Sequence, residues 1–194
     1  MMKTRWNACH ALMNSLQNPV ISPLDADWSP LLFETLTSVI VHCKNFKVRI
    51  NATLALSQPS SRACYGAHFT KVWTTVVILL GDEPSAPGSM AGYTEKLRIQ
   101  LILLLCHLIC FHGDGDRDMM TSSLSRLSAP SIAQCSDSST SDKLTENEVT
   151  LVTHARAVVK DLQPEFVVAM EMLSPRQLPD DDAAFKTGLI TANS

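Results

Sequence analysis

The apolar residues of segment 43–56 recur at helical spacing. Val48, Ala52, Ala55 and Leu56 follow one another at intervals of four, three and one residues. Because an α-helix completes a turn in 3.6 residues, these four positions lie on one face. Two of them are alanines, whose small side chains allow a neighbouring helix to approach closely. The segment is therefore predicted to be a tightly packed interior helix.

The same pattern occurs 44 residues earlier in the chain. There the corresponding residues are Arg5, Ala8, Ala11 and Leu12, with Arg5 standing in the place of Arg49. A looser third copy, in which leucines replace the alanines, comprises Arg98, Leu101 and Leu104. A recurring period of about 40–47 residues carried by helix pairs is typical of HEAT and armadillo arrays. The pattern thus predicts a helical repeat protein.

Apolar stripes and helix-ending signals predict where the helices lie. Pro30 suits the first turn of a helix, and Asn18-Pro19 ends the one before it. The predicted helices cover residues 3–17, 29–42, 46–56, 68–80 and 93–111. Residues 57–66 and 81–92 are predicted to be loops. Segment 28–56 is then a complete helix pair, and 3–17 is the second helix of a pair whose first helix is missing.

Beyond residue 112 the composition changes. Of the 21 residues from Thr121 to Ser141, 11 are Ser or Thr, so segment 113–144 is interpreted as a Ser/Asp-rich disordered linker. Thr145 and Glu148 have the spacing of a capping box and predict a new helix start. Residues 145–173 are expected to form C-terminal helices, and 174–194 a flexible tail.

These elements define the expected fold and domains. The fold is all-α: a HEAT-type α-α solenoid, a right-handed superhelix of antiparallel helix pairs, over residues 1–112 with about two and a half repeats. Only seven glycines and no alternating strand pattern argue against an all-β fold.

The net charge and the apolar segments of the chain indicate which kinds of partner are not expected. The chain carries −3 overall, divided into +3 for residues 1–112 and −6 for residues 113–194. Neither part has the strongly basic character of a nucleic-acid surface, so no nucleic-acid partner is expected.

The longest apolar run, Leu101–Phe111, is too short for a membrane span, and the N-terminus has no apolar signal-peptide core. We expect an intracellular protein, cytoplasmic or nuclear, with reduced cysteines and no membrane partner.

The recurring arginines are the first candidates for a function. Arg5, Arg49 and Arg98 occupy the same place in successive copies of the pattern. They are interpreted as structural inter-repeat residues that form a ladder along the array. A phosphate-binding row is the alternative.

Cysteine and histidine residues raise the possibility of a metal or catalytic site. Cys106 and Cys110 share a helix face, and so would Cys64 and His68. Yet the chain has no Cys-x-x-Cys pair and no local nucleophile signature. We therefore expect no metal, no cofactor and no enzyme activity, with a Cys/His-dependent hydrolase as a lesser alternative.

The acidic segment from Asp114 to Asp118 imitates the start of a calcium-binding EF-hand loop. It departs from that motif where Met119 replaces the glycine and Ser125 the final glutamate. It is interpreted as the acidic start of the linker.

Several short stretches of the sequence resemble a known protein family. Lys3–Cys9, Leu36–Val39 and Cys43–Ile50 resemble the C-terminal part of a HEAT repeat-containing protein, and Tyr65-Gly66 with the following aromatic residues continues the likeness. It covers residues 3–112. Asn45 departs from the family pattern, in which many repeats place an aspartate nearby. The resemblance implies a HEAT solenoid that serves as an interaction scaffold, with no catalytic residues.

The predicted function is therefore non-enzymatic protein–protein interaction. The chain is expected to be a fragment or short form of a longer array, with protein partners and further HEAT repeats packing at its N-terminal edge. An RNA-binding α-repeat protein is the alternative. Such proteins repeat their stacking aromatics, whereas Trp6 is replaced by Ile50 and Ile99 in the later copies.

Overall fold

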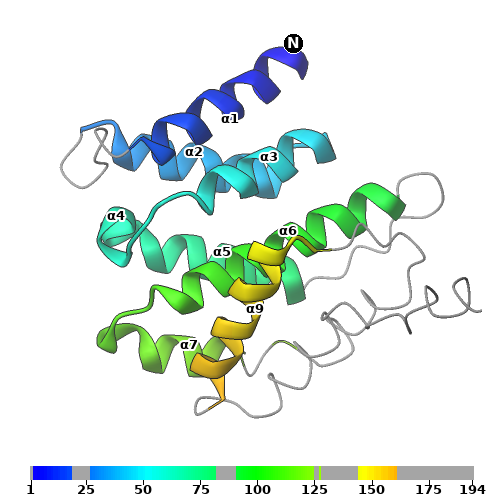
Figure 1. Cartoon of the computed structure of the whole chain (residues 1–194). Coiled ribbons are helices and arrows are strands. Elements are labelled where there is room, and N and C mark those ends of the chain that lie inside the picture. Colours follow the sequence, from blue (N-terminus) through cyan, green and yellow to red (C-terminus); the bar gives the residue numbers. More distant parts are fainter. Residues whose placement is uncertain (1, 19–26, 82–90, 125–126, 128–143, 161–194) are drawn as a thin grey trace, which may run out of the picture.

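The computed structural model describes residues 2–18, 27–81, 91–124, 127 and 144–160 (Figure 1). All regular structure in these residues is helical, and they contain no strand. The all-α prediction is thereby confirmed. The helices are α1 Met2–Gln17, α2 Ser29–His42, α3 Phe46–Leu56, α4 Arg62–Tyr65, η1 Gly66–His68, α5 Phe69–Gly81, α6 Ala91–Cys110, η3 Asp114–Asp116, α7 Arg117–Leu124 and α9 Glu146–Val159.

Local capping explains several of these boundaries. Asn45 is the N-cap of α3, where its side-chain oxygen accepts from the Val48 amide at 3.1 Å. At α9 the predicted capping box is confirmed. The Thr145 amide donates to Glu148 Oε2 at 2.7 Å, and Thr145 Oγ1 accepts from the Glu148 amide.

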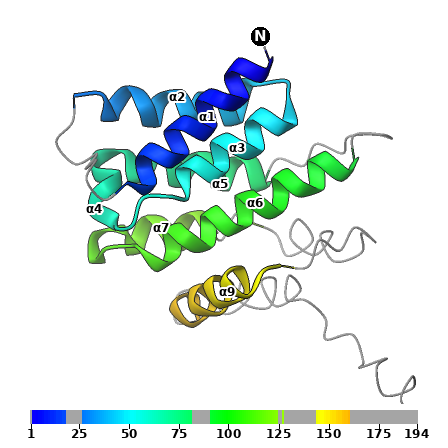
Figure 2. The same ribbon diagram turned by 45° about the horizontal axis from the view of Figure 1, so that its top comes forward.

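The helices pack in two rows. In one row α1 contacts α3, α3 contacts α6, and α6 contacts α9; in the other, α2 contacts α5 and α5 contacts α7. The rows are joined where α2 packs on α3 and α5 on α6. Figure 2 shows α1, α3 and α6 side by side in front of α2, α5 and α7. Each helix therefore packs mainly on its neighbours in the row and on its partner in the other row.

Burial recurs along both rows. Leu32, Phe33, Leu36 and Ile40 of α2 are buried, and so are the residues of α5 that lie 40 positions later: Val72, Trp73, Val76 and Leu80. The buried residues of α3 recur in α6 at a spacing of 49, as Leu97, Leu101, Ile102, Leu104 and Leu105. Corresponding residues thus face the core in successive helix pairs.

Aromatic side chains of α2, α4 and α5 form a connected group in the core. Phe33, Tyr65, Phe69 and Trp73 are fully buried. The Tyr65 hydroxyl donates to the Leu56 carbonyl at 2.6 Å, which satisfies an acceptor at the C-terminal end of α3. Burial raises the pKa of Tyr65 well above its usual value.

Two loop predictions are wrong. Residues 113–124 form η3 and α7 instead of the start of a disordered linker, with Met120 and Leu124 fully buried. These two residues are four apart and share a helix face, a signal that the Ser/Thr-rich composition hides. The polar loop predicted over 57–66 contains the short helix α4. The linker segment 128–143 and the expected structure after residue 160 lie outside the described residues.

The helical stretch Arg62–Gly81 is, by length and composition alone, apolar enough to cross a membrane. Core helices meet the same criteria. Here Phe69, Trp73 and Leu80 of this stretch are buried in the core, which accounts for its apolar composition.

Candidate protein-interaction surface

The three recurring arginines occupy different environments. Arg49 Nε donates to the carbonyl of Ile40 at 2.6 Å, and its guanidinium lies over the Phe46 ring at 5.5 Å. This hydrogen bond joins α3 to α2, two helices of the same pair, instead of linking successive pairs as the ladder prediction required. Burial lowers the pKa of Arg49. Arg98 is half-buried on α6, whereas Arg5 is exposed on α1.

The predicted packing residues separate into an interior group and an edge group. Ala52 and Ala55 are fully buried, as are Val48, Leu56, Leu101 and Leu104 to within a few per cent. Ala8 and Ala11 are exposed, and Leu12 is only half-buried. The prediction that both alanine stripes face a neighbouring helix is therefore wrong for α1 among the described residues. The reason is that α1 turns Cys9 and Leu16 toward the core, so its alanines face away from the other described helices.

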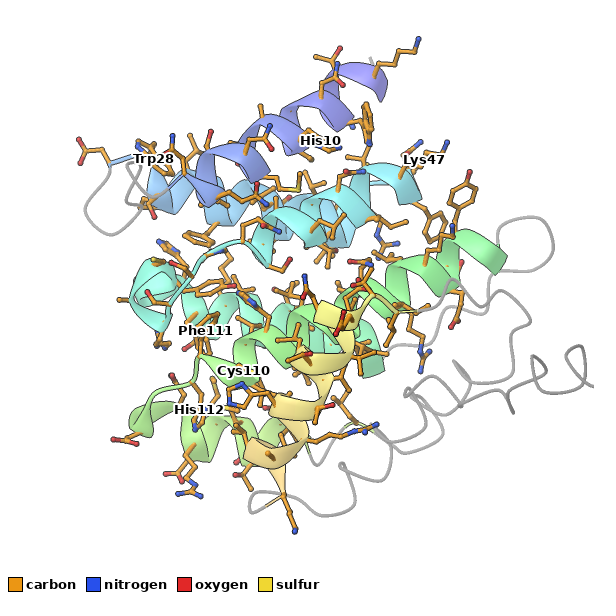
Figure 3. The ribbon with its side chains drawn as sticks, in the orientation of Figure 1. His10, Trp28, Lys47, Cys110, Phe111 and His112 are labelled. Carbon is orange, nitrogen blue, oxygen red and sulfur yellow. The ribbon has the colours of Figure 1, made fainter. Side chains whose placement is uncertain are left out.

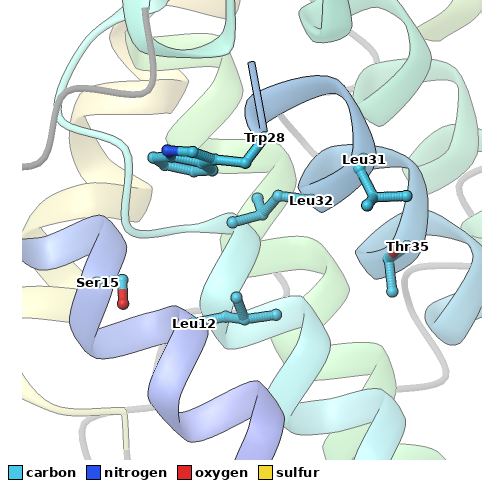
Figure 4. Close-up of a pocket in the computed structure, with 6 residues that line it drawn as sticks. All are labelled: Leu12, Ser15, Trp28, Leu31, Leu32 and Thr35. Carbon is cyan, nitrogen blue, oxygen red and sulfur yellow. The ribbon is translucent and has the colours of Figure 1, made fainter. Parts of the chain in front are cut away.

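Next to these alanines lies an apolar groove of about 480 Å³ between α1 and α2. We call it the edge groove; its lining residues are Leu12, Ser15, Trp28, Leu31, Leu32 and Thr35. Leu12 and Ser15 come from α1, Leu31, Leu32 and Thr35 from the first two turns of α2, and Trp28 is the N-cap residue of α2 (Figure 4). Trp28 and Leu31 remain 39% and 68% exposed. No lining residue is charged, so the groove presents apolar surface to whatever covers it.

The corresponding place one helix pair later is occupied. The residues 40 positions after Trp28 and Leu31 are His68 and Lys71. His68 stacks on Phe33 of α2 with ring centroids 5.3 Å apart, and Lys71 Nζ lies 3.1 Å from Glu34 Oε1. Thus α2 covers the surface formed by His68 and Lys71. The corresponding surface at Trp28 and Leu31 remains exposed.

The sequence patterns anticipated only part of the groove. The sequence pattern predicts Leu12 in a packing stripe, but it does not mark Leu31 and Thr35, which are exposed. Leu31 lies outside the i, i+4, i+8 face formed by Leu32, Leu36 and Ile40. A leucine outside the buried face of a helix is the signal in the sequence that could have pointed to the groove.

The cysteines and histidines that were candidates for a metal or catalytic site make contacts within the fold. Cys64 Sγ lies 3.2 Å from Ser61 Oγ, and His68 stacks on Phe33. Cys110 and His112 gather with Phe111 at one end of α6, away from Trp28 (Figure 3), and His112 Nδ1 lies 2.8 Å from the Ile109 carbonyl oxygen. Burial raises the pKa of Cys106 to about 12 and that of Cys110 to about 11. In the part of the chain that the structure describes, no three His, Cys, Asp or Glu side chains gather as a metal site would need.

Asp116, in the segment that imitates an EF-hand, has a structural role. Its Oδ2 accepts from Arg62 Nε at 2.7 Å and its Oδ1 from Arg62 Nη2 at 3.1 Å. The same carboxylate accepts from the Gly113 amide, while the Arg62 guanidinium also lies 4.1 Å from the Phe69 ring centroid. Hydrogen bonding to Arg62 is the main cause that lowers the pKa of Asp116. The pair fastens the start of α4 to η3.

Comparison with known proteins leaves the family open. No family model and no solved structure matches the chain. An uncharacterized protein of Dictyostelium discoideum is 37% identical over 120 residues, which cover 56% of this chain and 8% of that protein. The chain therefore corresponds to less than a tenth of that relative's length.

Proposed function

We propose that this chain is a segment of a HEAT-type α-solenoid that acts as a non-enzymatic scaffold for protein–protein interaction. In a solenoid, each helix pair contacts only its neighbours and corresponding residues are buried in each repeat. The two rows of helices and the burial that recurs at spacings of 40 and 49 residues support this arrangement. The resemblance of residues 3–112 to HEAT repeats agrees with it.

The observation that carries the binding function is the exposed apolar surface at the edge groove. The groove and the neighbouring Ala8 and Ala11 of α1 are exposed, whereas the corresponding Ala52 and Ala55 are fully buried. Contiguous exposed apolar surface of this kind marks interaction sites in proteins.

Affinity capture from a cell lysate, read by quantitative mass spectrometry, tests the proposal. The purified chain should enrich specific proteins over bare resin, and nuclease treatment should leave them bound. Loss of all captured proteins on nuclease treatment would favour the RNA-binding alternative. Enrichment no greater than that of an unrelated helical protein would contradict the scaffold function.

A further inference from the structure

We propose that α9 is a reversible cap on α6, which releases as a unit and thereby covers or exposes an apolar face of α6. This inference goes beyond the proposed scaffold function, because it concerns the movement of one helix and does not depend on which partner the chain binds. Three observations carry it: the seat that α6 provides, the attachment of α9 on one side, and the way in which α9 begins.

The first observation is that α6 is apolar on the side where α9 lies. All residues from Leu101 to Cys106 are buried, and this run is longer than one helical turn, so α6 is covered on every side there. α3 and α5 cover two of these sides, and α9 covers another. Figure 2 shows α9 across α6 from α3. The release of α9 would therefore expose apolar surface of α6.

The second observation is that α9 is held on one side. In the two preceding helix pairs, α2 packs on α3 and α5 packs on α6. Among the described helices, α9 packs on α6 but does not form a packed pair with α7, the helix before it in the chain. The connection from α7 to α9 covers residues 125–145, whereas residues 43–45 separate α2 from α3. α9 can therefore leave α6 while α7 stays in place.

The contact face of α9 is a narrow stripe of small apolar residues. Val152, Ala155 and Val159 are buried and follow one another at intervals of three and four residues, so they share one face of the helix. Below this helix lies Cys106 of α6, which is fully buried. Burial raises the pKa of Cys106 to about 12, and the nearby Arg156 of α9 acts in the opposite direction. The Cys106 thiol is therefore close to α9 and can report whether α9 is docked.

The third observation is that α9 begins with a cap of its own. The Thr145 amide donates to Glu148 Oε2 at 2.7 Å, and Glu146 and Glu148 place negative charge in the first turn. These groups all belong to the start of α9, so its N-terminal end is satisfied without the rest of the protein. The helix can therefore form and dock as an independent unit.

Native-state hydrogen exchange of the parent chain, read by mass spectrometry, tests the release of α9. A short helix that leaves its seat opens readily in water, so the amides of α9 should exchange at least about tenfold faster than those of α5 and α6. If α9 exchanges as slowly as α5, it is an integral part of the fold and the proposal is wrong.

A fluorescent peptide that reproduces residues 144–160 tests the seat. In the parent chain α9 itself occupies α6 at a high effective concentration, so the added peptide should bind weakly. In the full-length variant Ala155→Glu, a charge at a fully buried position should release α9 and leave the seat open. Fluorescence anisotropy should then show that this variant binds the peptide at least about tenfold more tightly than the parent.

Ala157→Glu is the matched control, because it makes the same change at an exposed position of the same helix and should bind the peptide as the parent does. Alkylation by N-ethylmaleimide, followed residue by residue by mass spectrometry, gives a second measurement. Cys106 should react faster in Ala155→Glu than in the parent, whereas Cys9, which α1 turns toward the core, should react at the parent's rate.

Three results would overturn the proposal. The first is peptide binding that is no tighter in Ala155→Glu than in the parent, and the second is an equal effect of Ala157→Glu. The third is faster alkylation of Cys9 together with Cys106, which would mean that the whole chain unfolds when α9 is displaced. None of these results depends on the capture of proteins from a lysate, so the cap and the scaffold function can fail separately.

Discussion

At the scale of single residues, Arg62 and Asp116 show how distant positions fix the helix rows. Arg62 precedes Asp116 by 54 residues and makes two hydrogen bonds to its carboxylate. The sequence placed Asp116 in an acidic segment, but its partner could not be identified because local spacing carries no information about a contact of this range. Asp116 is nearly buried, so its hydrogen bonds are shielded from water more than those of a surface pair.

Asp116→Asn is expected to lower the free energy of unfolding by about 1–3 kcal/mol at neutral pH, because hydrogen bonds to a charged acceptor are lost. The folded state lowers the pKa of Asp116, so its contribution is fully present above the unfolded value of 3.8. It is lost as the pH falls through the folded pKa. Urea unfolding at pH 7 and pH 3 should show the difference between parent and variant shrinking in acid. Asp114→Asn, an exposed neighbour, should have little effect at either pH; an equal loss there would contradict the assignment.

His107 provides a second pH-dependent contribution. Its Nε2 lies 3.0 Å from the Pro59 carbonyl oxygen, and burial lowers its pKa. Below pH 6.5 the unfolded chain binds a proton at this histidine before the folded chain does. Stability should therefore fall as the pH drops from about 6.5 toward the lower folded pKa. His107→Gln should flatten that part of the stability profile measured by thermal unfolding. Exposed His154→Gln should leave the slope unchanged, and a parent slope that survives in His107→Gln would refute this explanation.

At the scale of elements, the prediction of each helix depended on how regularly apolar residues recur in its segment. The bounds of α2 follow from Pro30 and its apolar stripe, and they coincide with the observed Ser29–His42. α7 was missed because its helix is built from only two buried apolar residues within a Ser-rich composition. Its attachment depends on a long-range hydrogen bond from Trp73 Nε1 to Ser123 Oγ at 2.7 Å.

Ser123→Ala is expected to lower stability by about 1–3 kcal/mol, because the buried Trp73 indole N–H loses its acceptor. Chemical unfolding followed by tryptophan fluorescence measures this effect. Ser122→Ala changes an exposed hydroxyl of the same helix and should have a much smaller effect. Equal losses in the two variants would mean that the hydrogen bond to Trp73 does not stabilise α7.

At the scale of the whole molecule, the same sequence pattern has two outcomes because its neighbours differ. Ala52 lies between helices on several sides, whereas Ala8 lies at the end of a row. The recurring spacing therefore indicated which residues correspond, but the burial of each residue depends on which helices surround it. For the same reason the edge groove could not be recognised before the rows were seen in three dimensions.

Ala52→Glu and Ala8→Glu make this difference measurable. At Ala52, which is fully buried, a glutamate places a charge in the core without a partner, and the loss should be at least about 3 kcal/mol. In a domain of this size such a loss removes much of the total stability. At Ala8 the new carboxylate reaches water, so the change should stay within about 0.5 kcal/mol. Circular dichroism melting curves compare the two: Ala52→Glu should melt far below the parent or not fold, and Ala8→Glu should melt like the parent. If both variants melt alike, corresponding positions of the pattern do not differ in environment, and the placement of α1 at the end of its row of helices is wrong.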